Sequence, residues 1–176
     1  MTIVTIFLII FVVLMFFISK KLSPIPYFPT NKKDLSLIVK SMKLKNNMNV
    51  IDLGAGTGAV IFKASRWAYD KKLNTKFYAI EINPVLILIL YLRKMFHKNR
   101  KNIFINYCDM MKINLRKFKN PLFFLYLSPF HLDLIYKKIK KETKKPKIIT
   151  YFYKLPKIKY LSKLQGTNDV FVYITT

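Results

Sequence analysis

Three carboxylates and a cluster of glycines are the residues of this chain best suited to hold a small ligand. The segment Val50-Ile51-Asp52-Leu53-Gly54-Ala55-Gly56-Thr57-Gly58 holds three of the four glycines of the chain, directly after an apolar run that contains Asp52. Glycines in such a turn let a ligand approach the backbone where side chains would clash. The G-x-G-x-G spacing differs from the G-x-G-x-x-G of dinucleotide folds, and a tight turn without a ligand is the alternative.

Two further acids follow apolar runs in the same way. The chain has only 8 Asp and Glu; Glu81 lies near the end of one run, and Asp109 follows the next. If the runs are parallel strands, Asp52, Glu81 and Asp109 share the edge where such sheets bind ligands. Carboxylates there suit ribose hydroxyls and an exocyclic amine, whereas a diphosphate favours lysine or bare helix amides. The expected ligand is an adenosine that carries positive charge, and S-adenosyl-L-methionine, a sulfonium, fits that description.

The elements that position these residues alternate between strands and helices. Residue patterns predict strands over 48–53, 76–82, 103–107, 121–127 and 147–153, and helices over 59–70, 84–98 and 132–142. Asn31 is expected to cap an earlier helix, and two short strands, 157–161 and 170–175, are expected around a turn at Gly166, Asn168 and Asp169. This order predicts an α/β fold with a Rossmann-like, mostly parallel, seven-stranded sheet covered on both faces.

The first nineteen residues contain no charged side chain and are apolar from Ile3 to Ile18 apart from Thr5. As a helix, about 18 residues span roughly 27 Å, near the lower limit for a bilayer core. All 32 Lys and Arg follow residue 19, which predicts a single-pass transmembrane anchor with the body on the cytoplasmic side. A cleaved signal peptide is the alternative, but it would need a basic start and small residues before the cut.

The chain therefore divides into an anchor over 1–19, a proline-rich linker over 20–30 and one domain over 31–176. The balance of 32 basic and 8 acidic residues gives a net charge of +24, which predicts attraction to anionic lipid or to nucleic acid. An AT-rich coding bias would also explain many lysines. The single cysteine, Cys108, excludes a disulfide framework, and no residue spacing predicts a metal site.

Three motifs of the chain, taken in order, resemble those of class I S-adenosylmethionine-dependent methyltransferases: residues 50–58, Glu81-Ile82-Asn83-Pro84 and Cys108-Asp109-Met110. Two shorter elements, Pro26-Tyr27-Phe28-Pro29-Thr30 and Tyr126-Leu127-Ser128-Pro129, resemble those of a subgroup of small enzymes. That subgroup includes the membrane-anchored protein-lysine methyltransferases of the ATP synthase c subunit and the adenine nucleotide translocase. Phe28 stands where the subgroup usually has valine.

The resemblance implies a methyltransferase that takes S-adenosyl-L-methionine, with a membrane-protein lysine as substrate. The Tyr-Leu-Ser-Pro element differs from the Asn/Asp-Pro-Pro-Tyr/Phe sequence that hydrogen-bonds the planar amino group in adenine or glutamine methylation. Adenine and glutamine are therefore disfavoured as substrates. A nucleic-acid methyltransferase and a non-catalytic, membrane-anchored binding module remain as alternatives. No catalytic base is assigned. The implied cofactor-binding residues are Tyr27, Thr30, Asp52, Gly54, Ala55, Gly56, Gly58, Glu81, Asn83, Asp109 and Met110, and the implied substrate-facing residues are Tyr126, Ser128 and Pro129.

Overall fold

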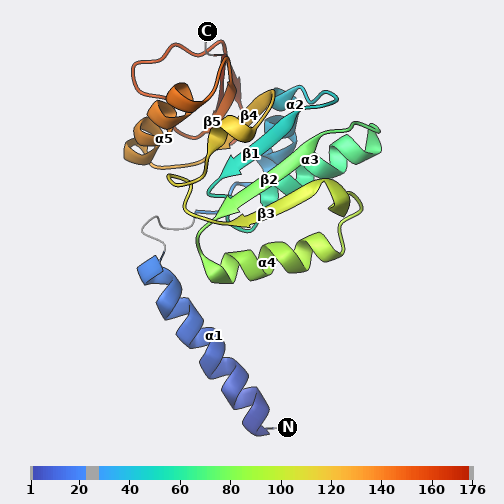
Figure 1. The fold of residues 1–176 in the computed structure, drawn as a ribbon, viewed down its shortest axis with the longest axis vertical. Helices are drawn as coiled ribbons and strands as arrows, with labels where there is room; N and C mark the ends of the chain where they lie inside the picture. The colour runs from blue at the N-terminus through green and yellow to red at the C-terminus, as the bar shows by residue number, and fades with distance from the viewer. Residues whose placement is uncertain (1, 23–27, 175–176) are drawn as a thin grey trace.

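The computed structural model describes residues 2–22 and 28–174, with the side chains of 13–22 outside the description. Its body is a single twisted sheet with helices packed on both faces, and the first helix extends away from that body (Figure 1). The strands are β1 (Asn49–Leu53), β2 (Lys76–Glu81), β3 (Ile103–Tyr107), β4 (Pro121–Leu125), β5 (Lys147–Tyr151), β6 (Ser162–Gln165) and β7 (Asp169–Ile174).

The strand order is β3-β2-β1-β4-β5-β7-β6. Strands β1 to β5 pair in parallel, and β7 is antiparallel to both of its neighbours. The predicted Rossmann-like, mostly parallel, seven-stranded sheet is therefore confirmed. Because the order reverses direction between β1 and β4, the carboxyl ends of the central strands leave a crevice at that switch point.

Two hydrophobic clusters fill the two faces of the sheet, and alternate residues of β1 point into each. Val50 belongs to the cluster under the helices α2 (Leu35–Met42) and α3 (Ala59–Asp70), and Ile51 belongs to the cluster under α5 (Pro129–Glu142). This burial on both faces explains why the central strands read as nearly continuous apolar runs. The helices of the body are α2 (Leu35–Met42), α3 (Ala59–Asp70), α4 (Pro84–Met95) and α5 (Pro129–Glu142), with short 3₁₀ turns at Lys32–Asp34, Arg100–Asn102 and Leu115–Lys117.

Three boundaries differ by three or more residues from the sequence-based expectation, and several strand ends differ by one or two. Helix α5 begins at Pro129 rather than at Leu132, because Ser128 takes the extended N-cap position and proline suits the first turn. Helix α4 ends at Met95 rather than at Lys98. The strand expected over 157–161 lies at 162–165 instead. The tight turn pairs Gln165 with Asp169, and this register places the residues that pair with β7 directly before the turn.

The buried carboxylate of Asp34 fastens that hairpin to the start of α2. It accepts hydrogen bonds from the Tyr151 hydroxyl at 2.7 Å and from the amides of Thr167 at 2.7 Å and Asn168 at 3.0 Å. Gly166 leaves room for this contact, since a Cβ there would lie 2.3 Å from Asp34 Oδ1. The expected cap is also present: the Asn31 side chain accepts a hydrogen bond from the Lys33 amide.

The N-terminal helix α1 (Thr2–Leu22) contacts α4. Within residues 2–22 and 28–174, no helix combines the length and the apolar character needed to cross a membrane. The transmembrane span expected over 1–19 is thus not supported.

Candidate ligand-binding site

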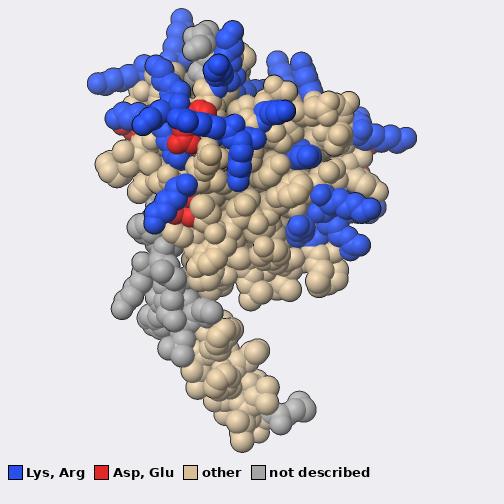
Figure 2. All heavy atoms as spheres, in the orientation of Figure 1, with Lys and Arg blue, Asp and Glu red and all other residues tan. Residues whose placement is uncertain are grey.

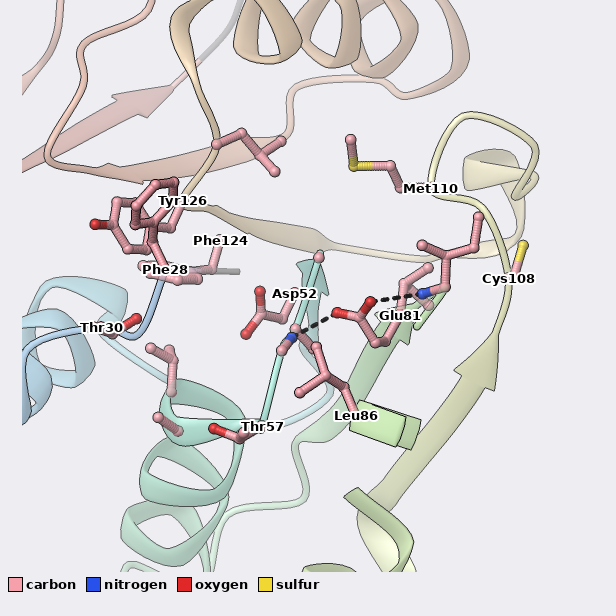
Figure 3. Close-up of a pocket in the computed structure, with 18 of the residues that line it drawn as sticks. Phe28, Thr30, Asp52, Thr57, Glu81, Leu86, Cys108, Met110, Phe124 and Tyr126 are labelled. Atoms are coloured by element: carbon pink, nitrogen blue, oxygen red, sulfur yellow. Dashed lines mark hydrogen bonds between the residues drawn. The ribbon is translucent and has the colours of Figure 1, made fainter. Parts of the chain in front are cut away.

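A pocket opens at the carboxyl ends of β1, β2 and β4, at the switch point of the sheet (Figure 3). The space inside it, including open solvent at its mouth, is about 930 Å³. The glycine loop forms one side, the ends of β2 and β3 form a second, and Phe28, Phe124 and Tyr126 form a third.

The glycine loop has the left-handed backbone that its sequence suggests. Gly54, Gly56 and Gly58 have φ values of 87°, 56° and 76°, which residues with a Cβ adopt only under strain. The amides of Gly54 and Ala55 both donate to the Ile80 carbonyl, at 2.9 and 3.0 Å. The loop is thus tied to β2 before any ligand is considered.

The Glu81 carboxylate is held by three backbone amides. One oxygen accepts from Gly56 at 2.8 Å, and the other accepts from Ile82 and Asn83, both at 2.9 Å. The side chain is buried, so its position is fixed by the backbone around it. A carboxylate offers about four acceptor sites; three are used by these amides, so about one remains for a donor that enters the pocket.

The Asp52 carboxylate lies between Glu81 and the Thr30 side of the pocket (Figure 3). Burial, followed by the charge of Glu81, raises the pKa of Asp52 to about 8. Among the described contacts, the carboxylate that accepts a hydrogen bond from an amide of the glycine loop is Glu81 rather than Asp52. The raised pKa instead makes Asp52 a group that gains its charge most readily beside a cation.

The segment after β3 closes the opposite side. Asp109 accepts a hydrogen bond from the Met111 amide at 2.8 Å, and Met110 is buried against the pocket. The amide of Cys108 donates to the Glu81 carbonyl at 2.9 Å, which places this segment directly beside the end of β2. A flat group between Met110 and Glu81 would meet a thioether and a carboxylate.

The third side is mainly aromatic. Phe28 and Thr30 come from the segment before α2, while Phe124 and Tyr126 come from the end of β4. The Tyr126 ring packs edge-on against Tyr151, with centroids 4.9 Å apart. Burial, with Tyr153 nearby, raises the pKa of Tyr126, so its hydroxyl keeps its proton at neutral pH.

The pocket brings together most of the residues proposed from the sequence. Those that line it are Thr30, Asp52, Gly54, Ala55, Gly56, Glu81, Asp109, Met110 and Tyr126. Tyr27 lies outside the described residues. Four others, Gly58, Asn83, Ser128 and Pro129, are not part of the lining.

These four residues shape elements rather than the pocket wall. Gly58 is the N-cap of α3, and a Cβ there would lie 2.5 Å from Leu90 and 2.7 Å from Phe62. The Asn83 side chain caps α4 by accepting the amides of Val85 and Leu86. Ser128 and Pro129 open α5 and are exposed; the Ser128 hydroxyl lies 2.8 Å from His131 Nδ1.

Sequence reasoning missed several lining residues. Leu86 and Phe124 belong to apolar runs that read equally well as core, and Phe28 belongs to the proline-rich linker over 20–30; only the fold brings the three to one cavity. Cys108 carried a weak signal, because it adjoins Asp109.

Charge separates this pocket from a phosphate site. Its described lining contains the acids Asp52, Glu81 and Asp109 and no lysine or arginine, in a chain with 32 basic residues. Over the part of the chain that the structure describes, no group of His, Cys, Asp and Glu is arranged to hold a metal ion.

Solved structures with the same fold are numerous. An RNA methyltransferase from Salinibacter ruber, solved in complex with S-adenosyl-L-homocysteine, superposes with a TM-score of 0.74 at 14% identity, over 84% of this chain and 93% of that one. A precorrin-6y C5,15-methyltransferase from Geobacter metallireducens gives 0.62 at 16% identity, over 82% and 88%. A predicted N6-adenine-specific DNA methylase from Listeria monocytogenes gives 0.66 at 11% identity, over 82% and 51%.

No protein-family model matches the chain, and no curated protein matches it in sequence. The structural likeness assigns the fold, which is that of class I S-adenosylmethionine-dependent methyltransferases. The resemblance to the membrane-anchored protein-lysine subgroup is not supported by these comparisons.

Proposed function

We propose that the chain is a methyltransferase that uses S-adenosyl-L-methionine. The observation that carries the proposal is Glu81, a carboxylate held by the glycine-loop amide at the end of β2, inside an acidic pocket of a methyltransferase-like fold. The same fold also carries other functions in principle, so the residues of the pocket have to support the assignment.

The lining fits the cofactor from end to end. The remaining acceptor site of the Glu81 carboxylate suits a ribose hydroxyl, Met110 and Asp109 suit the adenine ring and its amine, and Asp52 suits the sulfonium or the amino group. The lack of lysine and arginine in the described lining disfavours nucleotides with a diphosphate. S-Adenosyl-L-methionine, when bound, supplies a methyl group on a positively charged sulfur, ready for in-line displacement.

The chain then has to position a nucleophile and exclude water. Phe28, Phe124 and Tyr126 form an aromatic wall that performs both tasks without a strong base. A lysine amine must lose its proton before it can attack, and an apolar surrounding favours the neutral amine. We therefore propose a lysine side chain as the substrate, in a membrane protein reached near the bilayer surface.

Attachment to the membrane is the second part of this proposal. The uncharged stretch of residues 1–19 precedes every basic residue of the chain, which supports a body held at the cytoplasmic face of a membrane. Such attachment raises the effective concentration of substrates in the same membrane. Extraction of native membranes with alkaline carbonate tests it: release of the chain into the supernatant would contradict attachment through an inserted helix.

A nucleic-acid methyltransferase is the second candidate function, because Lys and Arg gather over the upper part and the right-hand side of the body in Figure 2. Its RNA substrate would bind with a steep salt dependence. A non-catalytic module would bind the cofactor but transfer no methyl group to any fraction.

Two measurements test the proposal in sequence. Isothermal titration should show binding of S-adenosyl-L-methionine and of its demethylated product; if neither binds, the assignment is wrong. Methyl-labelled cofactor is then incubated with native membranes and, separately, with RNA. Label in protein lysines supports the first candidate, label in RNA supports the second, and binding without label in either supports the module.

A further inference from the structure

Helix α4 has an exposed apolar face that neither the core nor the pocket uses. Its buried side consists of Leu86 and Leu90. The exposed residues recur at spacings of three and four, so they form one stripe along the helix. Each is at least half exposed, and together we call them the α4 stripe: Leu88, Tyr91, Leu92, Met95 and Phe96.

The α4 stripe is larger than the single apolar residues that are normal on protein surfaces. Phe96, at its end, is 83% exposed. In Figure 2 the lower edge of the body, where α4 lies in Figure 1, is a continuous surface without blue or red side chains until its right-hand end. Such a surface indicates contact with something that is itself apolar.

The charges beside the stripe are all positive. Between residues 82 and 108 the sequence contains no Asp or Glu. Arg93 is used within the body, because its guanidinium donates to the Thr57 carbonyl and lies over the Phe62 ring. Three lysines, Lys94, Lys98 and Lys101, lie near the carboxyl end of α4. An apolar stripe with cations at its border and no acids is typical of a helix that lies in the interface of an anionic membrane.

A second helix, α1, also exposes apolar side chains. It contacts α4, and its described side chains from Ile3 to Val12 include many exposed apolar groups, among them Ile3 and Phe7. Both helices thus expose apolar side chains, although α1 extends away from the body (Figure 1).

Charge also decides between the occupants of the stripe. A second copy of this chain would bring another +24, and like charges at close range disfavour such pairing. A nucleic acid offers a backbone of charged phosphates, and these make no favourable contact with five apolar side chains. An anionic bilayer offers both an apolar layer and negative headgroups.

We propose that the α4 stripe lies in the headgroup region of an anionic lipid bilayer, with α4 parallel to the membrane plane. This surface is independent of the N-terminal stretch and of the catalytic assignment. Leu86, in the first turn of the same helix, lines the pocket. Binding through the stripe therefore places the pocket beside the lipid surface rather than at an arbitrary height and angle above it.

Site-specific fluorescence tests the proposal in the full chain. With Cys108, the only cysteine, replaced by serine, an environment-sensitive dye is attached at Leu92→Cys or, as the control, at the exposed Lys137→Cys on α5. Vesicles of phosphatidylcholine, with and without phosphatidylglycerol, carry quencher-labelled acyl chains. We expect at least about twofold stronger quenching at 92 than at 137, increased by the anionic lipid. Equal quenching at the two sites on vesicle-bound protein would overturn the proposal.

A second variant separates the stripe from α1, which stays unchanged throughout. Leu88→Gln with Met95→Gln should abolish the quenching at 92, while Leu161→Gln, an exposed apolar residue away from α4, should preserve it. Quenching at 92 that survives the double substitution would show that α1 alone brings the dye to lipid and would overturn the proposal. A blue shift at 92 that appears without vesicles and grows with protein concentration would identify a second copy as the occupant, with the same consequence.

Discussion

The Glu81 carboxylate accepts a hydrogen bond from the backbone amide of Gly56 at 2.8 Å. This contact joins the end of β2 to the middle of the glycine loop, so the group expected to hold ribose also sets the shape of the loop. Binding of a ligand to Glu81 should therefore depend on both β2 and the glycine loop.

Replacing Glu81 tests that double role. Glu81→Ala should weaken the binding of S-adenosyl-L-methionine by about 1–3 kcal/mol, because charge-assisted hydrogen bonds are lost and the loop amide is left without its acceptor. Isothermal titration measures the change. Asp133→Asn, on the far helix α5 and in an ion pair with Lys137, is the matched carboxylate control and should leave affinity unchanged. Equal affinities for wild type and Glu81→Ala would remove Glu81 from the ligand.

Gly54 and Gly58, two glycines with a left-handed backbone, should respond differently to replacement by alanine. Both have positive φ, so both variants carry the strain of a left-handed residue, roughly 1–2 kcal/mol. A Cβ at Gly58 also meets Leu90 and Phe62 closer than 3 Å, whereas at Gly54 the nearest atom, from Leu127, is 3.4 Å away. Gly58→Ala should therefore cost about 1–3 kcal/mol more in unfolding free energy.

Urea denaturation compares these two variants, and titration with the cofactor gives the complementary result. Gly54→Ala should impair binding more than folding, since Gly54 lines the pocket. Equal stabilities of the two proteins would contradict the placement of Gly58 behind the loop.

The pKa of Asp52 predicts how binding varies with pH. It is about 8 in the free protein, and a bound cation lowers it by favouring the carboxylate. Binding then releases a proton, so the affinity for S-adenosyl-L-methionine should rise as pH increases from 6 toward 8 and level off above the free pKa. The affinity for the demethylated, uncharged thioether should rise less.

Asp52→Asn provides the control for this pH effect, because it removes the titrating group and leaves the cofactor's own amine. The difference between the two ligands in their pH dependence should shrink in this variant. Parallel pH curves for wild type and Asp52→Asn would show that Asp52 does not face the cation.

Asp34 should make stability sensitive to acid. Burial alone would raise its pKa, but hydrogen bonds from Tyr151, Thr167 and Asn168 outweigh burial and lower it below the ordinary 3.8. Because the folded pKa is the lower one, this stabilisation is complete above the unfolded value and is lost as pH falls through the folded value. The loss should therefore be seen below about pH 4.

Asp34→Asn should destabilise the protein at pH 7 by about 1–3 kcal/mol, because an amide cannot accept from all three donors at once. The control is Asp70→Asn, an exposed partner of Arg66, which should change stability by less than about 1 kcal/mol. Thermal unfolding at pH 7 and pH 3 gives both numbers. A variant at position 34 as stable as wild type at pH 7 would show that the β6–β7 turn does not depend on this carboxylate.

The sequence by itself determined the order and type of most elements. Apolar runs buried on both sides, such as 50–53 and 122–125, cannot be amphipathic surface strands, so alternation with helices required a covered parallel sheet. It also determined which edge carries the chemistry, since Asp52 and Glu81 lie in the last two residues of their strands and Asp109 follows β3 by two residues. Element type and the position of an acid within its segment are properties of short stretches of sequence. The spacing of apolar residues and the local composition are enough to predict them.

Only the tertiary structure decided which of two neighbours faces the cavity. Gly56 and Gly58 look alike in sequence, yet Gly58 packs against Leu90 of another helix. Asp52 and Glu81 both suit the loop, yet Glu81 reaches its amide. Phe28 and Phe124 lie 96 residues apart (124 − 28) and line one pocket. Such facts depend on how α4, β4 and the segment before α2 pack around the sheet, and local pattern carries no information about distances between segments remote in the chain.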